Sequence, residues 1–285
     1  LGKVSGWGWS FGYFGGMLTL GLCLAVVLSA QAAGAPATEF VPRTMLITAA
    51  VFAVAATPTF LLLKERAGAG AGGRAANGHG RSALQRLRHT WQESARFRDF
   101  RRLLVCGCCY QAGIAVVVAL AAVYAEQAMG FTQAQTMTLV FLVNIASAAG
   151  AFLFGYAQDR VGHKRALAWT LWGWVAMVVV AALGRSVELF WLAATLAGLC
   201  MGSSQSCGRA MVGAMSPPER LAEFYGLWNF AVRLAAIVGP VTYGLVTWLT
   251  EGNHRLAIGI TGLFFLAALA LLRGIDVERG VPAAH

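Results

Sequence analysis

The residues best suited to chemistry in this chain lie in one short polar segment, Gly155 to Arg165, between two long apolar runs. It holds two glycines, one acid and three bases at regular positions: Gly155, Asp159, Arg160, Gly162, Lys164 and Arg165. Gly155 lets two helices approach closely, and Gly162 permits a tight turn. Asp159 can accept hydrogen bonds at a helix end or pair with a neighbouring helix. A contact of this kind that exists in one conformation only is a latch between states, so the segment predicts a conformational switch.

A second group of polar residues lies inside the apolar runs or at their margins, where they are candidates to line a cavity or form a polar network. Its members are Tyr110, Gln111, Asn144, Gln205, Arg209, Glu223 and Arg233. Tyr110, Gln111 and Asn144 are of a kind that more often makes packing hydrogen bonds between helices. Gln205 and Arg209 are four residues apart and share one helix face. Glu223 opens an apolar run, where either helix capping or pairing with Arg209 explains it.

Arg233 lies near the middle of its apolar run. A charge at that depth is costly unless it faces protein or water, so we expect it to face the interior of a helix bundle. Three roles are open: contact with an anionic solute, membership of an interhelical polar network, or hydrogen bonds to helix carbonyls that only hold the bundle together.

Nothing in the sequence supports catalysis. The histidines lie outside the apolar runs, and neither H-E-x-x-H nor G-x-S-x-G nor a pair of intramembrane aspartates is present. The six cysteines lie in or beside apolar runs and are expected to pack as small hydrophobic residues. Cys106, Cys108 and Cys109 match no zinc spacing. We therefore expect no catalytic residue, no metal and no cofactor.

Membrane-spanning helices must position these residues. Apolar residues make up 58% of the chain and charged residues 12%, against about 25% charged in soluble domains. A bilayer core about 30 Å thick requires about 20 apolar residues in a helix. Such runs occur at 7–29, 43–63, 103–125, 134–157, 166–184, 189–208, 224–249 and 255–273. We expect an all-α, polytopic membrane bundle with about eight spans, the first retained and not cleaved as a signal peptide, since seven more follow.

The distribution of positive charge gives the orientation. Eighteen Lys and Arg residues fall in one alternate set of connections, and only Arg43, Arg185 and Arg255 fall in the other. Because basic connections stay cytoplasmic, both ends of the chain are expected in the cytoplasm. The net charge of +10 is then explained by membrane topology. The expected partner is membrane lipid, and no nucleic-acid partner is expected.

The basic connection 64–102 divides the chain into regions 1–63 and 103–285. Its first part is rich in Gly and Ala and is typical of a flexible linker. Its second part, Ser82 to Phe100, fits either a basic amphipathic helix on the inner leaflet or a solvated loop.

The Gly155 to Arg165 segment resembles the loop signature G-x-x-x-D-R-x-G-R-R of the major facilitator superfamily, with His163 at a usually basic position. An ordinary topology-fixing loop would explain its bases but not its glycines and acid. Segments Val4 to Gly16, Gly202 to Arg209, Ala222 to Leu227 and Arg233 with Gly239-Pro240 resemble the Atg22-like, or UMF1-type, members. The resemblance implies twelve helices in two halves. Region 1–63 would then hold the last two helices of the N-terminal bundle, 64–102 the central cytoplasmic linker, and 103–285 the six-helix C-terminal bundle.

The same resemblance implies a secondary active transporter of small polar solutes, with amino acid efflux as one activity, working by alternating access. It implies a monomer in the bacterial inner membrane, with a solute and a coupling ion as partners. Relatives carry an acid beside the glycine early in the seventh helix, whereas Gln111-Ala112-Gly113 has none. A scaffold or signalling protein that kept the fold without transport is therefore the alternative, and an intramembrane enzyme is not favoured.

Overall fold

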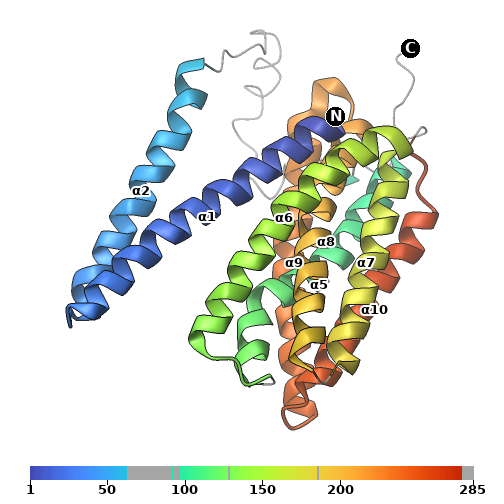
Figure 1. Ribbon diagram of the computed structural model, residues 1–285. Helices are drawn as coiled ribbons and strands as arrows, with labels where there is room; N and C mark the ends of the chain where they lie inside the picture. The colour runs from blue at the N-terminus through green and yellow to red at the C-terminus, as the bar shows by residue number, and fades with distance from the viewer. Residues whose placement is uncertain (63–90, 93–96, 128, 185, 278–285) are drawn as a thin grey trace. The chain divides into compact units, whose positions relative to one another are not determined.

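The computed structural model describes residues 1–62, 91–92, 97–127, 129–184 and 186–277, in which the chain is helical and contains no strand (Figure 1). Eight long helices in these ranges are long and apolar enough to cross a bilayer, as the sequence predicts. They are α1 (Gly2–Ala32), α2 (Ala37–Leu62), α5 (Arg98–Gln127), α6 (Gln133–Val161), α7 (His163–Leu183), α8 (Val187–Met215), α9 (Leu221–Leu249) and α10 (His254–Arg273), with a short 3-10 helix, η2 (Pro218–Arg220), before α9.

The chain forms two compact units. One consists of Leu1–Phe11 and Ser82–His285, and the other of Gly12–Arg81. The second unit holds most of α1 together with α2, and Cys23 contacts Thr44 across this hairpin, with 3.6 Å between its Sγ and the Thr44 carbonyl oxygen. The first turns of α1 belong to the unit that contains helices α5 to α10.

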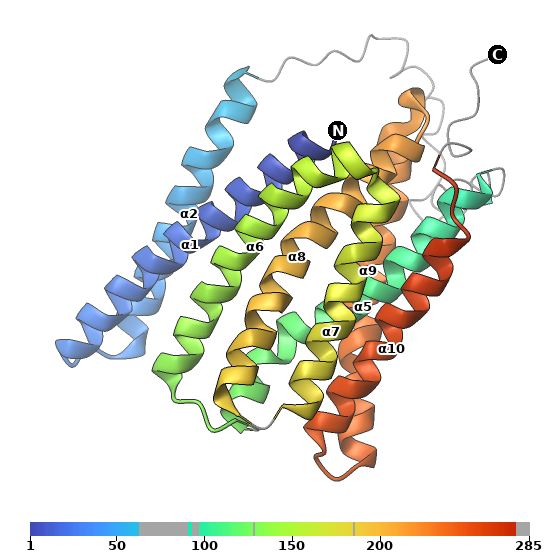
Figure 2. The ribbon, with the colours of Figure 1, turned by 45° about the vertical axis from the view of Figure 1, so that its right-hand side comes forward.

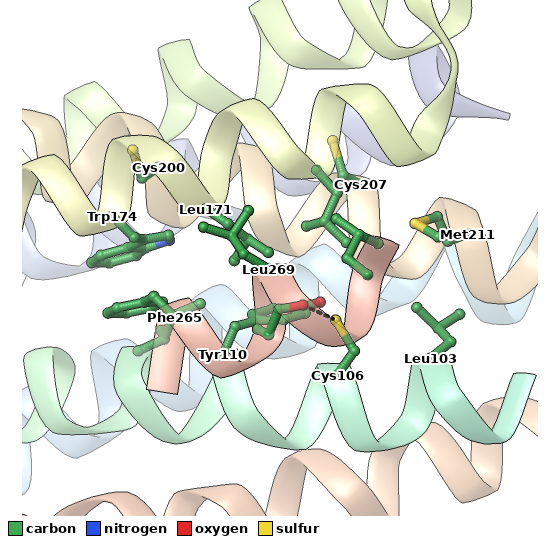
Figure 3. Packing of buried hydrophobic residues seen from close by; sticks show 14 of the residues in the cluster. Leu103, Cys106, Tyr110, Leu171, Trp174, Cys200, Cys207, Met211, Phe265 and Leu269 are labelled. Atoms are coloured by element: carbon green, nitrogen blue, oxygen red, sulfur yellow. Dashed lines mark hydrogen bonds between the residues drawn. The ribbon is translucent and has the colours of Figure 1, made fainter. Parts of the chain in front are cut away.

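Helices α5 to α10 pack side by side as a bundle (Figure 2), in which α6 packs mainly on α8, α5 on α9, and α7 on both α8 and α10. Figure 3 shows the buried core between them. Trp174 stacks on Phe265 with ring centroids 5.0 Å apart, and the Cys106 thiol donates to the carbonyl of Ala268 over 3.3 Å. Cys200 and Cys207 are also buried in this core.

Three helices begin at a capping side chain. Thr132 and Gln135 form a capping box at the start of α6, where each satisfies a backbone amide of the other. Ser186 caps α8 over 3.3 Å, and Asn253 caps α10 over 3.0 Å. These caps satisfy amides that have no partner within their helix, and they fix where the spans begin.

Several helices extend beyond the expected apolar runs: α1 begins at Gly2, α2 at Ala37 and α5 at Arg98, and α6 ends at Val161 and α8 at Met215. Helix α8 continues to Met215, about two turns beyond position 208, and most of this extension, including Met211 and Met215, is buried in protein. Its Ser203 hydroxyl donates to the carbonyl of Leu199 over 2.9 Å. Helix α5 begins at Arg98, inside the connection expected over 64–102. Most of the expected amphipathic segment, 82–100, lies outside the described residues, and the division into regions 1–63, 64–102 and 103–285 stays a prediction.

Candidate functional site

The signature segment forms one tight corner. Helix α6 ends at Val161 and α7 begins at His163, so Gly162 alone joins them, with φ at +88°. Side-chain-bearing residues rarely adopt that conformation. His163 Nδ1 lies 3.3 Å from Oε1 of Gln158 across the corner.

Asp159, in the last turn of α6, binds the start of α1. Its Oδ1 accepts a hydrogen bond from the backbone N–H of Gly2, and its Oδ2 accepts one from the N–H of Lys3, each over 2.9 Å. First-turn amides have no partner within a helix, and the partial positive charge of a helix N-terminus favours a carboxylate there. One carboxylate therefore accepts hydrogen bonds from two successive amides at the start of α1.

The helices α1 and α6 cross at a pair of glycines. A Cβ atom on Gly155 would lie 3.0 Å from Gly6 Cα, and one on Gly6 would lie 2.6 Å from the carbonyl oxygen of Ala151. The two backbones therefore approach closely enough for Asp159 to reach the amides of α1.

Three serine and glutamine side chains extend this contact, and none of them was expected from the sequence to be a site residue. The Ser5 hydroxyl donates to the carbonyl of Ser206 in α8 over 2.9 Å. Gln158, which is almost fully buried, donates from Nε2 to Oγ of Ser206 over 3.2 Å. The available signal was the uncharged polar residue directly before Asp159 in an otherwise apolar run.

The bases of the signature do not share one role. Lys164 Nζ donates to the carbonyls of Arg273 and Ile275, over 3.0 and 2.6 Å, at the end of α10. Arg102 Nη1 donates to the intervening carbonyl of Gly274 over 2.7 Å. Cations are favourable at a helix C-terminus, so these two side chains hold the end of α10. The signature residues Arg160 and Arg165 are exposed, and neither has a hydrogen bond or ion pair within the described ranges.

Gln111 of α5 and Gln205 of α8 face each other. Gln111 Nε2 donates to Oε1 of Gln205 over 2.9 Å, and Gln205 Nε2 donates back to Oε1 of Gln111 over 3.1 Å. Tyr110 is fully buried beside them, with its ring 6.3 Å from that of Trp228. The Tyr110 hydroxyl has no hydrogen-bond partner among the residues that the structure describes.

The suggested pair of Arg209 and Glu223 is not formed. Glu223 lies in the first turn of α9 and binds Arg220, with the shorter contact of 2.6 Å from Nη2. The Arg209 guanidinium lies over the ring of Tyr225, 5.6 Å from its centroid. The two charges therefore have separate local partners.

The last two candidates lie in different surroundings. Asn144 Nδ2 donates to the carbonyl of Val140 over 2.8 Å, a bond within its own helix. Arg233 is exposed on α9 and, within the described ranges, makes no hydrogen bond, ion pair or ring contact. No group of His, Cys, Asp or Glu in those ranges could hold a metal ion.

Comparison with known proteins gives one family across the chain. The family model described as "Vacuole effluxer Atg22 like" matches residues 2–285. The uncharacterised MFS-type transporter YxiO of Bacillus subtilis is 21% identical over 99% of this chain. Autophagy-related protein 22-1 of Neosartorya fischeri is 25% identical over 98% of this chain. The chain spans 65% of the length of the first relative and 48% of the second.

Among solved structures, the chain is similar to the human organic anion transporter MFSD10 (TETRAN). The TM-score is 0.56 at 20% identity, over 61% of this chain and 40% of that one. At this identity the similarity shows a shared fold, the major facilitator bundle, and not a shared substrate.

Proposed function

This chain belongs to the Atg22-like family of the major facilitator superfamily, and we propose that it is part of a secondary transporter for small polar solutes. It is an integral membrane protein with eight apolar spans among its described helices. Transport proceeds by alternating access, in which two bundles rock about a central site. The family's description as effluxers makes export the first activity to test, and amino acids, which the sequence resemblance implies, are the first solutes to try.

One observation carries the proposal: Asp159 accepts hydrogen bonds from two amides at the start of α1. The family resemblance implies that α1 belongs to the N-terminal bundle and Asp159 to the C-terminal one. A carboxylate on a helix end is held by a few hydrogen bonds and a dipole, so it can release when the halves separate. Such a contact stabilises one conformation of a two-state equilibrium, which an alternating-access protein requires.

The expected surroundings follow from the charge pattern. The positive-inside bias supports an orientation with both ends of this chain on the cytoplasmic side, and the proposed location is the bacterial plasma membrane. The Asp159 contact then lies at the cytoplasmic face and closes it. The transporter acts as a monomer without catalytic residues, on a solute and a coupling ion.

A second candidate function is a scaffold or signalling protein that kept the fold without transport. Every Asp and Glu within a described helix lies within two residues of a helix end. Proton coupling commonly uses an acid deep in the membrane, so its absence from these helices is the observation that favours this alternative.

Counterflow in proteoliposomes of the full-length protein separates the two. Vesicles are loaded with one unlabelled amino acid at a time, and uptake of the same labelled compound is followed. Wild type should accumulate at least one member of the panel, and Asp159→Asn should change its rate while Arg43→Gln, an exposed base outside the signature segment, should not. If wild type moves no solute under any imposed ion gradient, the transporter proposal fails.

A further inference from the structure

Two polar residues on α9 have no partner in the described part of the chain. Asn229 and Arg233 are both exposed, and the described residues offer neither of them a hydrogen bond, ion pair or ring contact. They are four residues apart, so their side chains are neighbours on one helix face.

The pair lies deep in the membrane. Arg233 follows the first residue of α9, Leu221, by 12 residues and precedes its last residue, Leu249, by 16. At 1.5 Å per residue these separations are about 18 and 24 Å, which places Arg233 near the middle of a 30 Å core. A guanidinium and an amide at this depth are costly in hydrocarbon and must face protein, water or a polar ligand.

The face that carries them is narrow and open. Gly226, Ala236 and Pro240 flank the pair at intervals of three or four residues, and a Cβ atom on Gly226 would meet nothing within 4 Å. The exposed apolar side chains Leu234, Val241 and Leu245 lie further round the helix, whereas Phe230 and Ile237 border the pair.

Pro240 adds an acceptor to this face. It lies within the helix and has no N–H, so the carbonyl of Ala236 lacks its usual donor. The face therefore offers a fixed positive charge, an amide and a backbone carbonyl within about two turns.

The described helices offer Arg233 no acidic partner at its depth in the membrane. The described helices carry no Asp or Glu further than two residues from a helix end, so none of them neutralises Arg233. A solute that bears a negative charge would be attracted here, and a simple cation would be repelled.

We propose that Arg233 and Asn229 form a binding subsite for the carboxylate of a small solute. The biological role of this subsite rests on the proposed transport function, whereas its test measures binding and requires no transport. The planar guanidinium donates two parallel hydrogen bonds to a carboxylate, and the Asn229 amide one turn away donates a third. The main competing arrangement is an ion pair between Arg233 and an acid on a segment outside the described residues.

The test uses binding to the full-length protein in detergent, read as a rise in melting temperature, because a ligand stabilises the folded state that binds it. The probes form matched sets: leucine, 4-methylpentanoate, which lacks the amine, and 3-methylbutylamine, which lacks the carboxylate, with the corresponding sets for glutamate and phenylalanine. Wild type should be stabilised by carboxylates of at least one set and not by the matching amine. Loss of charge-assisted hydrogen bonds should weaken carboxylate binding about 10- to 100-fold in Arg233→Gln.

Three further variants make the result specific. Arg233→Lys should retain part of the binding, because lysine keeps the positive charge but cannot donate the two parallel hydrogen bonds of the guanidinium. Asn229→Ala should weaken binding less than Arg233→Gln does, and Leu245→Ala, an exposed residue about three turns further along α9 and on another side of the helix, should bind as wild type. The proposal is overturned if amines stabilise wild type as well as carboxylates, if no probe stabilises it, or if folded Arg233→Gln binds unchanged. Should Arg233→Gln fail to fold, unchanged binding by both Arg233→Lys and Asn229→Ala would overturn it.

These results separate the two proposals. Carboxylate binding that depends on Arg233, without counterflow of any solute, would leave the subsite standing and remove the transporter. Counterflow of neutral or cationic solutes alone would support the transporter and overturn the carboxylate subsite.

Discussion

Asp159 and Lys164 lie five residues apart on the two sides of Gly162 and hold the ends of two different helices. The acid accepts hydrogen bonds from the first amides of α1, and the base donates to the carbonyl of Arg273, the last residue of α10, and to that of Ile275 just beyond it. Each charge meets the helix end of opposite partial charge. One short corner therefore contains an anionic contact to the start of α1, which we propose as the switch, and a cationic contact at the end of α10.

Removing the charge of Asp159 should loosen the start of α1. Asp159→Asn keeps an oxygen that can accept one amide but loses the charge–dipole interaction, which is worth about 0.3–2 kcal/mol. We expect faster hydrogen–deuterium exchange in a peptide covering residues 2–10 of the full-length protein. Arg160→Gln, an adjacent exposed residue, is the control. Identical exchange in Asp159→Asn and wild type would show that the contact does not hold α1.

The glycine crossing should tolerate no methyl group on α1. In Gly6→Ala the new Cβ would lie 2.6 Å from a backbone oxygen of Ala151, and such overpacking costs about 1–3 kcal/mol. We expect a lower melting temperature. Gly8 lies on the same helix with open space around it, so Gly8→Ala should be neutral or stabilising. Equal melting temperatures for the two variants would contradict the close approach.

Lys164 should stabilise the bundle in every conformation. Lys164→Ala removes two hydrogen bonds at the end of α10, and we expect a loss of about 1 kcal/mol, measured as a lower melting temperature. Lys164→Arg should recover part of it, and Arg165→Ala should have no effect. The expectation is wrong if Lys164→Ala changes the exchange of residues 2–10 as Asp159→Asn does while leaving the melting temperature unchanged.

The two amides of Gln111 and Gln205 should be energetically coupled. Each single change to Leu leaves one amide unpaired, whereas the double change removes both amides. The double variant should therefore lose less unfolding free energy than the two single variants lose in sum. Interhelical hydrogen bonds in membranes give couplings of about 0.6–1.7 kcal/mol. A double-mutant cycle on unfolding free energies measures this quantity. Additive effects would mean that the pair contributes nothing beyond packing.

Tyr110→Phe should raise stability. The hydroxyl is buried without a hydrogen-bond partner in the described ranges, and an unsatisfied buried group costs about 1–3 kcal/mol. Removing it leaves the ring contact with Trp228 intact. A melting temperature below that of wild type would show that the hydroxyl has a partner, such as water or a solute, and would add Tyr110 to the binding site.

The sequence by itself determined the class of the protein and most of its helices. Because unpaired backbone groups are excluded from hydrocarbon, long apolar runs can only be helices, and the eight expected runs match the eight long helices of the described chain. It also located the signature corner, since Gly155, Asp159 and Gly162 have recognisable local roles. The end of α8 at Met215 was not predictable in this way, because hydropathy measures suitability for lipid and this end is buried in protein.

The tertiary structure decided which groups meet. Asp159 binds amides that lie 157 and 156 residues earlier in the chain, and Gln111 binds a residue 94 positions later. Helical periodicity gives the face on which a side chain lies, but not the helix that faces it. For the same reason the sequence left Glu223 between two readings, and only the packing of α8 and α9 gave it Arg220 as its partner and left Arg209 over Tyr225.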